Sequence, residues 1–197
     1  MNIFIKNNYI DSSSPFALSK FSNLVFKYLS EEYTKNGDLI ILCIGTDRST
    51  GDSLGPLVGH KLKPIIKNYK DVNLIGNLEN PIHAQNLQET IDMINRDYDN
   101  PFILAIDSSL GKYDRIGYLS IKNSPLKPGS GVNKVLPSVG DISITGIVNI
   151  SGMMEFMVLQ NTRLSLVMNM ADIISKSIYL SLSRLYSETN QPYILER

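Results

Sequence analysis

Two short, unbroken apolar runs constrain the fold of this chain more than any other feature. They are DLIILCIG at residues 38–45 and PFILAIDSSL at residues 101–110. Apolar runs of this length are typical of parallel strands that helices cover on both faces. Between them, residues 52–67 and 81–98 carry apolar side chains at helical spacing. The chain therefore alternates between strands and helices.

The same alternation extends along the rest of the sequence. Further strands are expected at residues 71–77, 116–123 and 141–150, and further helices at residues 12–33 and 163–186. This order predicts an α/β fold with three layers, α/β/α, and a mostly parallel sheet. No linker, repeat or low-complexity tract divides the 197 residues. We therefore expect a single domain spanning residues 1–197.

The predicted last helix carries two apolar series. One series, which includes Val167 and Ile174, is what packing on the sheet requires. A second series includes Met170 and Leu180 and is wider than one buried face needs. Either the N-terminal helix covers this second series or a second copy of the chain does, so a homodimer is one expectation.

The charge balance argues against several kinds of partner. Lys and Arg together number 19, as do Asp and Glu, so the formal net charge is zero. No block of basic residues is present, and neither nucleic acid nor a membrane surface is an expected partner. No apolar run approaches the ~20 residues that span a bilayer. The single cysteine, Cys43, lies inside a predicted buried strand. This placement indicates a structural thiol, and we expect a reducing, cytoplasmic location.

The loop after the first apolar run has glycines but the wrong charge for a phosphate. Its sequence is CIGTDRSTGDSLGP at residues 43–56, and a P-loop would need lysine where it has Asp52. An acid at that point repels phosphate, and the GxGxxG dinucleotide motif is absent from the chain. The glycines therefore allow a sharp turn that carries a carboxylate, and nucleotide binding is not expected.

Two aspartates are expected at one edge of the sheet. Asp52 follows the loop after the first apolar run, and Asp107 ends the second run. In open α/β sheets the functional crevice lies beyond the carboxyl ends of the strands, where neighbouring strands would bring both acids together. Two such carboxyl groups share a proton for hydrolysis or hold a cation that polarises a carbonyl. The alternative roles are structural, with Asp52 in the first turn of a helix and Asp107 capping a turn.

Metal binding has little support in the sequence. His60 is expected to be a solvated residue on a helix, whereas His83 follows a predicted strand and is expected at the same edge as the aspartates. Oxygen donors dominate this set, so an ion held there would be a hard divalent ion rather than zinc. We expect no cofactor and leave a divalent ion at the aspartate site open.

Three motifs in one order resemble a known family. They are CIGTDRSTGDSLGPLVG at residues 43–59, LAIDSSLG at residues 104–111 and LKPGSGV at residues 126–132. Together with TRLSLVMNMADIISKSI at residues 162–178, they resemble the YyaC family of sporulation proteins over residues 38–186. The three motifs are also similar, more distantly, to the germination protease of bacterial spores.

This resemblance implies a fold and a site. The fold would be the phosphorylase/hydrolase-like α/β fold of hydrogenase maturation endopeptidases. Asp52 and Asp107 match the motif positions of the germination protease's proposed catalytic pair. The hydrogenase proteases add a histidine in a later loop to hold nickel, where this chain has Asp141 and no histidine. Nickel recognition is therefore not implied. The chain also has Thr46 and Asp47 where both relatives tend to have Gly-Asn.

The resemblance and the residues together lead to a functional expectation. We expect a peptidase of sporulation that uses Asp52 and Asp107 against a protein or peptide substrate, in the cytoplasm of the sporulating cell or in the spore interior. Supporting or substrate-binding roles are expected for five further residues: Thr46, Asp47, His83, Ser130 and Asp141. The alternative is a sporulation factor without catalytic activity that binds a peptide or protein partner in the same crevice.

Overall fold

The central element of the fold is a six-stranded sheet. The computed structural model describes residues 8–128, 136–152 and 154–187. Its strands are β1 (Tyr9–Asp11), β2 (Leu39–Cys43), β3 (Val72–Ile75), β4 (Phe102–Gly111), β5 (Tyr118–Lys122) and β6 (Ile142–Ile150), in the order β1-β5-β6-β4-β2-β3. Strands β3, β2, β4 and β6 are parallel, whereas β5 pairs antiparallel with β6 and with β1. The predicted mostly parallel sheet is confirmed.

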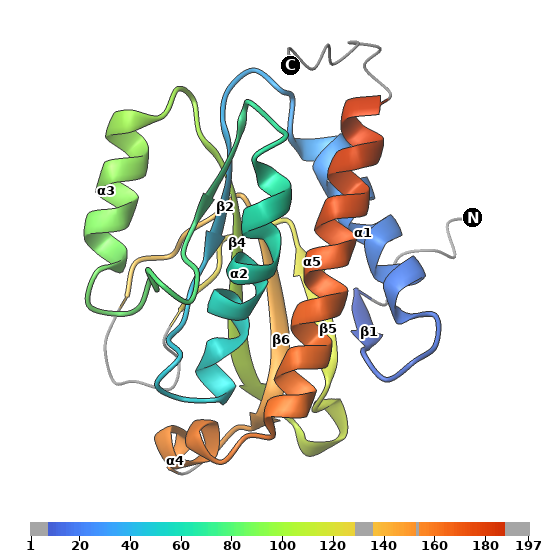
Figure 1. Cartoon of the computed structure of the whole chain (residues 1–197). Coiled ribbons are helices and arrows are strands. Elements are labelled where there is room, and N and C mark those ends of the chain that lie inside the picture. Colours follow the sequence, from blue (N-terminus) through green and yellow to red (C-terminus); the bar gives the residue numbers. More distant parts are fainter. Residues whose placement is uncertain (1–7, 129–135, 153, 188–197) are drawn as a thin grey trace.

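Helices cover both faces of the sheet. They are α1 (Ala17–Glu32), α2 (Leu54–Ile66), α3 (Leu87–Asp97), α4 (Glu155–Gln160) and α5 (Leu164–Ser187), with 3-10 turns η1 (Gly51–Ser53) and η2 (Tyr113–Arg115). Figure 1 shows α1, α2 and α5 on one side of the sheet, α3 on the other, and α4 below the strands. The three-layer prediction is confirmed. No helix in the described part of the chain combines the length and apolarity needed to cross a bilayer.

The position of β2 between two helical layers explains why its sequence is an unbroken apolar run. Leu39 and Ile41 point into the larger core, which α1, α2 and α5 cover. Ile40 and Leu42 point into a second core that includes residues of α3. Because successive side chains of a strand point to opposite faces, a strand between two helical layers needs apolar residues at every position.

The second apolar series of α5 is mostly buried, and part of it packs on the sheet: the Met170 side chain lies against Gly146 of β6. Met170 is fully buried and Ile173 is 8% exposed. The Ser181 hydroxyl of α5 also donates to the Ser22 carbonyl of α1 at 3.1 Å. Leu180 remains 44% exposed. The sheet and the neighbouring α1 therefore leave little of this series exposed, and a homodimer stays a prediction.

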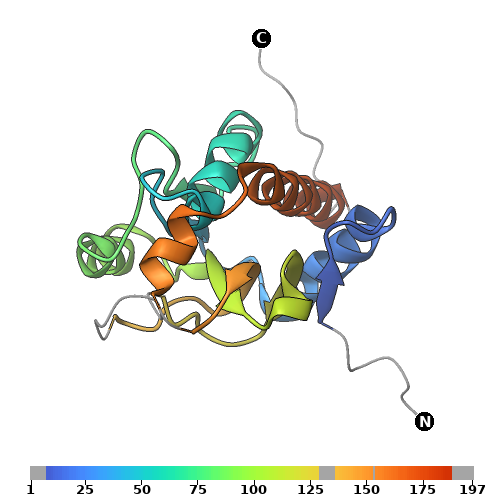
Figure 2. The same ribbon diagram turned by 90° about the horizontal axis from the view of Figure 1, so that it is seen from below.

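The structure differs from the sequence prediction at three places. The short edge strand β1 was not expected. Helix α3 begins at Leu87 rather than near residue 81, because Ile82 forms a parallel bridge with Ile44 and keeps that segment extended. The C-terminal helical region is divided into α4 and α5. Figure 2 shows the sheet from below, with α4 lying across its lower end.

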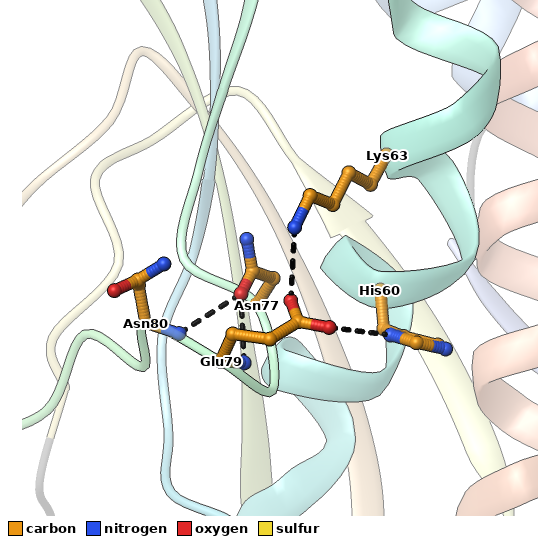
Figure 3. A network of polar contacts seen from close by, with 5 residues as sticks. All are labelled: His60, Lys63, Asn77, Glu79 and Asn80. Atoms are coloured by element: carbon orange, nitrogen blue, oxygen red, sulfur yellow. Dashed lines mark hydrogen bonds and ion pairs between the residues drawn. The ribbon is translucent and has the colours of Figure 1, made fainter.

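His60 is a surface residue, as expected. Its side chain is 53% exposed, and its Nδ1 lies 3.5 Å from Oε1 of Glu79. Lys63 donates to the same carboxylate at 3.2 Å, and the Asn77 side chain accepts hydrogen bonds from the backbone N–H groups of Glu79 and Asn80 (Figure 3). This ion-pair group holds the loop after β3 against α2 and lies outside the pocket described below.

At Gly55, the first turn of α2 packs too closely on Ile44, the residue after β2, to accept a side chain. A Cβ at Gly55 would overlap the carbonyl oxygen of Ile44, a backbone atom that cannot rotate away. We expect Gly55→Ala to lower the free energy of unfolding by about 1–3 kcal/mol, although alanine favours helix intrinsically. The control is Lys67→Ala at the exposed C-terminal end of the same helix, expected to change the free energy of unfolding by less than about 0.5 kcal/mol. Urea unfolding measures both, and a Gly55→Ala protein as stable as the parent would contradict this packing.

Candidate functional site

A pocket of about 350 Å³ opens at the carboxyl ends of β2 and β4. We call it the carboxylate pocket. Its walls come from the loop after β2, the turn before α3, the end of β4 and helix α4. Pro128 and Leu136 line it as well, and both Asp52 and Asp107 are among its lining residues. The structure therefore brings the two predicted aspartates to one site.

The loop after β2 turns sharply because of Gly45. Its φ of 137° is one that side-chain-bearing residues rarely adopt. The Gly45 N–H donates to the Ile82 carbonyl at 2.7 Å, and the Thr46 N–H donates to the Asp52 carbonyl at 2.9 Å. The first bond ties the loop to the segment before α3, and the second closes the loop on itself and holds Asp52 in the turn η1, directly before α2. Helix α2 has no side-chain N-cap bond, so Asp52 does not serve as its cap.

Asp107 lies where β4 passes the end of β2. Cys43, the last residue of β2, pairs with Ile106, and Asp107 is the next residue of β4. Its side chain is buried, with 6% of the residue exposed. The backbone N–H of Ser108 donates to the Asp107 carboxylate at 2.7 Å. Asp107 is thus held by its own strand at the inner end of the pocket.

The pocket raises the pKa of both carboxyl groups. Burial raises the pKa of Asp52 to about 6, although the Thr46 amide and the Ser108 hydroxyl lower it in part. Burial, and then the negative charge of Asp52, raise the pKa of Asp107 well above its usual range. Desolvation disfavours the charged form, and a nearby like charge disfavours it again. The pair therefore retains a proton near neutral pH, and the two carboxyl groups titrate as a coupled pair.

The other predicted residues divide into those at the pocket and those away from it. Thr46 and His83 line the pocket. The Thr46 hydroxyl also accepts hydrogen bonds from Arg48, through its backbone N at 3.3 Å and its Nε at 3.4 Å. Asp47 is exposed and is not part of the pocket lining. Ser130 lies outside the described residues.

The prediction that Asp141 lies at this rim is wrong. Asp141 directly precedes β6, so it lies at the amino ends of the parallel strands, opposite the pocket. Its carboxylate accepts a hydrogen bond from the Ile103 N–H at 2.7 Å, and its own N–H donates to the Ile103 carbonyl at 2.8 Å. Asp141 therefore joins the starts of β4 and β6 and has a structural role.

Sequence reasoning missed several residues of the pocket. Arg48 and Ser108 lie within the motifs at residues 43–59 and 104–111, but neither was predicted to be a site residue. Phe156 and Leu159 of α4 also line the pocket. Their place in the pocket could not be predicted from the sequence, because a helical pattern does not tell where the helix crosses the sheet. Arg48 provides a cation at the pocket wall, and α4 provides an apolar surface.

The pocket does not present a metal-binding group. Within the described residues, no three His, Cys, Asp or Glu side chains lie together in a way that could hold a metal ion. His83 lines the pocket, but its Nδ1 accepts a hydrogen bond from the Gln85 N–H at 3.3 Å. The donor set therefore does not fit nickel or another transition metal, and we derive no chemical step through one.

The arrangement suits acid–base chemistry on a neutral substrate. One carboxyl group is protonated and the other ionises at lower pH, so one donates a proton while the other accepts one. A pocket of this size, with apolar walls and a few polar groups, is typical of sites for small molecules or for short stretches of polypeptide.

Comparison with known proteins gives a family and a fold. The family described as "Protein of unknown function (DUF1256)" matches residues 9–177. The "Uncharacterized protein YyaC" of Bacillus subtilis (strain 168) is 51% identical over 143 residues, which are 73% of this chain and 69% of that protein.

A solved structure has a similar fold. It is a [NiFe] hydrogenase maturation protease, HycI from Thermococcus kodakarensis KOD1, with a TM-score of 0.53 and 17% identity. The likeness covers 81% of this chain and 99% of that one. At this identity it shows a shared fold and not a shared activity. From the family match and the relative together, this chain belongs to the DUF1256 family.

Proposed function

We propose that this protein is a peptidase in which Asp52 and Asp107 together activate a water molecule against a peptide carbonyl. The observation that carries the proposal is the presence of buried Asp107 and half-buried Asp52 in one pocket, with the pKa of each carboxyl group raised. The similarity of fold to a maturation protease supports it. From the resemblance of its motifs to the YyaC family of sporulation proteins, we propose a protein substrate in the cytoplasm of the sporulating cell or in the spore.

The two aspartates take different roles because their surroundings differ. Asp52 ionises first, so its carboxylate accepts a proton from the attacking water. Asp107 keeps its proton and donates it to the amide nitrogen as the carbon–nitrogen bond breaks. The water oxygen forms the new bond to the carbonyl carbon, and the products are a carboxylic acid and an amine. Thr46 supports the loop that carries Asp52, because its backbone N–H donates a hydrogen bond to the Asp52 carbonyl.

A binding protein without catalytic activity is the second candidate. The apolar wall formed by Phe156 and Leu159 would serve a bound peptide whether or not it is cleaved. The two candidates differ in what the aspartates must do. Catalysis requires both carboxyl groups for turnover, whereas binding alone predicts graded losses of affinity and no products.

Replacing either aspartate by asparagine tests the proposal. We expect Asp52→Asn and Asp107→Asn each to lower the cleavage rate about 10²–10⁴-fold, the usual contribution of a general acid or base. Folding should be retained, because asparagine has nearly the same shape and carries no charge to bury. The assay is incubation with a mixture of tryptic peptides and mass spectrometry of the products.

Asp47→Asn is the matched control. It lies in the same loop as Asp52 but is exposed and outside the pocket lining, so its cleavage rate should equal that of the unaltered protein. Two results would contradict the peptidase assignment: no product from any peptide with the unaltered protein, or full activity in Asp52→Asn or Asp107→Asn.

The pH dependence follows from the raised pKa of Asp52. Below pH 6 both carboxyl groups carry protons and no base is available, because burial raises the pKa of Asp52 to about 6. We expect kcat/KM to rise with pH through about 6 and to fall again when Asp107 also loses its proton. A profile that is flat from pH 5 to 7, or that rises only near the ordinary aspartate pKa of about 4, would contradict the assignment of Asp52 as base.

A chelator tests whether a divalent ion takes part. Because the described residues present no group of three metal ligands, we expect EDTA to leave the cleavage rate unchanged. The measurement is the peptide assay above with and without EDTA. Loss of activity with EDTA, and its recovery with added Mg²⁺, Mn²⁺ or Zn²⁺, would replace the paired-aspartate mechanism by a metal-dependent one.

A further inference from the structure

Strand β4 has an open edge inside the carboxylate pocket. On one side, β4 pairs with β2 only as far as Ile106. On its other side, β4 pairs with β6 as far as Gly111. Among the described residues, the stretch beyond Ile106 therefore has a partner strand on one side only. Ser108, Ser109 and Leu110 lie in this stretch and line the pocket.

The backbone of this stretch turns polar groups toward the pocket. The Ile106 carbonyl accepts a hydrogen bond from the Ile44 N–H at 2.7 Å, so the backbone of Ile106 points toward β2. Directions alternate along a strand, and the backbone of Ser108 therefore points to the same side. Beyond the end of β2, that side is the pocket. The Ser108 N–H donates to the Asp107 carboxylate there, where a neighbouring strand would otherwise offer a carbonyl.

A strand edge of this kind is a template for another extended chain. Adding a strand to an open edge is a recurring way of binding peptides, in which main-chain hydrogen bonds provide affinity and side-chain pockets provide specificity. The open edge here begins next to Asp107, and Asp52 lines the same pocket. A peptide paired with this edge would therefore pass its backbone directly in front of both carboxyl groups.

We propose that the pocket binds an extended polypeptide segment as an additional strand along the edge of β4 at Ser108–Leu110. The inference rests on the proposed peptidase function for its chemical outcome, but the binding mode stands without it. The substrate class is an unfolded or locally unfolded stretch of protein, because only an extended chain presents a backbone that can pair with a strand. A folded surface cannot enter the pocket in this way.

Helix α4 would select bound segments by the side chains that they place against it. Phe156 is 61% exposed and Met157 is 49% exposed, although both are large and apolar. Phe156 and Leu159 form one wall of the pocket, and Leu136 lies in the lining as well. Side chains of a strand alternate between two faces, so every second residue of the segment would face α4. We expect apolar residues at those positions.

A β-bulge limits how far the pairing extends. The register between β4 and β6 shifts between Ser109 and Leu110. Bulges increase the local twist and are common beside active sites, where they end a regular ladder. The added strand would therefore pair over a short stretch next to Asp107 and leave β4 where β4 itself bends.

The test is a scan of backbone methylation on a bound peptide. The probe is a library of short blocked peptides, screened by fluorescence anisotropy against the double variant Asp52→Asn/Asp107→Asn, which cannot cleave them. The tightest binder is then made with one backbone amide methylated at a time. Within the short stretch that pairs with β4, we expect losses of about tenfold, one hydrogen bond each, at alternate residues, and little change at the residues between them or outside the stretch. Losses without this alternation, or no peptide with a Kd below about 1 mM, would overturn the proposal.

Two matched phenylalanines test the apolar wall. We expect Phe156→Ser to weaken binding of the same peptide about tenfold without changing Tm. Phe16→Ser is the control, because Phe16 is 63% exposed, close to the 61% of Phe156, but lies outside the pocket lining. It should leave the affinity unchanged, although serine at this position, the N-cap of α1, is expected to raise Tm slightly. Equal affinities for the two variants would overturn the assignment of α4 as the wall that contacts the segment.

The outcomes separate this inference from the peptidase proposal. If methylation shows the alternating pattern but the unaltered protein does not cleave the peptide, the strand site stands and the peptidase proposal fails. If the peptide is cleaved without the pattern, the peptidase proposal stands and the strand site fails. A dimer in sedimentation that the peptide dissociates would assign the edge to a second copy of the chain and would overturn the proposal.

Discussion

The unequal length of two neighbouring parallel strands is the constraint on which this site depends. Strand β2 ends at Cys43, while β4 continues beside β6 to Gly111. The space that a longer β2 would fill becomes the carboxylate pocket. By alternation, Asp107 shares a strand face with Ala105, on the side of the smaller core, whereas Asp52 leads into α2 on the other side. The two carboxyl groups share a site only because β2 ends before Asp107 and no strand lies between them.

This geometry has an electrostatic consequence. In many α/β proteins the first loop after a central strand turns backbone N–H groups toward a phosphate. Here the loop closes on itself through Thr46 and places the half-buried carboxyl group of Asp52 in the same pocket as the buried carboxyl group of Asp107. Neither is paired with a cation among the described ion pairs. Buried like charges cost stability, and the pair reduces that cost by keeping a proton. A retained proton beside an ionisable carboxylate is what hydrolysis of a neutral amide requires.

The sequence predicted the parts of the structure that follow from local pattern. Unbroken apolar runs located the parallel strands, and the rule that crevices lie at the carboxyl ends of strands located Asp52 and Asp107. The same rule places Asp141 at the opposite edge, because Asp141 precedes its strand; the prediction that it lies at the rim came instead from its match to the histidine loop of the hydrogenase proteases. The three residues of β1 are too few to show alternation. Phe156 depends on where α4 crosses the sheet, which tertiary packing decides.

The most direct test of the account is an NMR titration of the Asp107 carboxyl carbon in protein labelled with ¹³C at aspartate. Burial and, after it, the charge of Asp52 raise the pKa of Asp107. With Asp52→Asn this contribution disappears while burial remains, so the Asp107 titration should move to lower pH. Asp47→Asn, which removes a charge outside the pocket, should leave it in place. A titration of Asp107 that is the same with and without the Asp52 charge would show that the two carboxyl groups do not share a site.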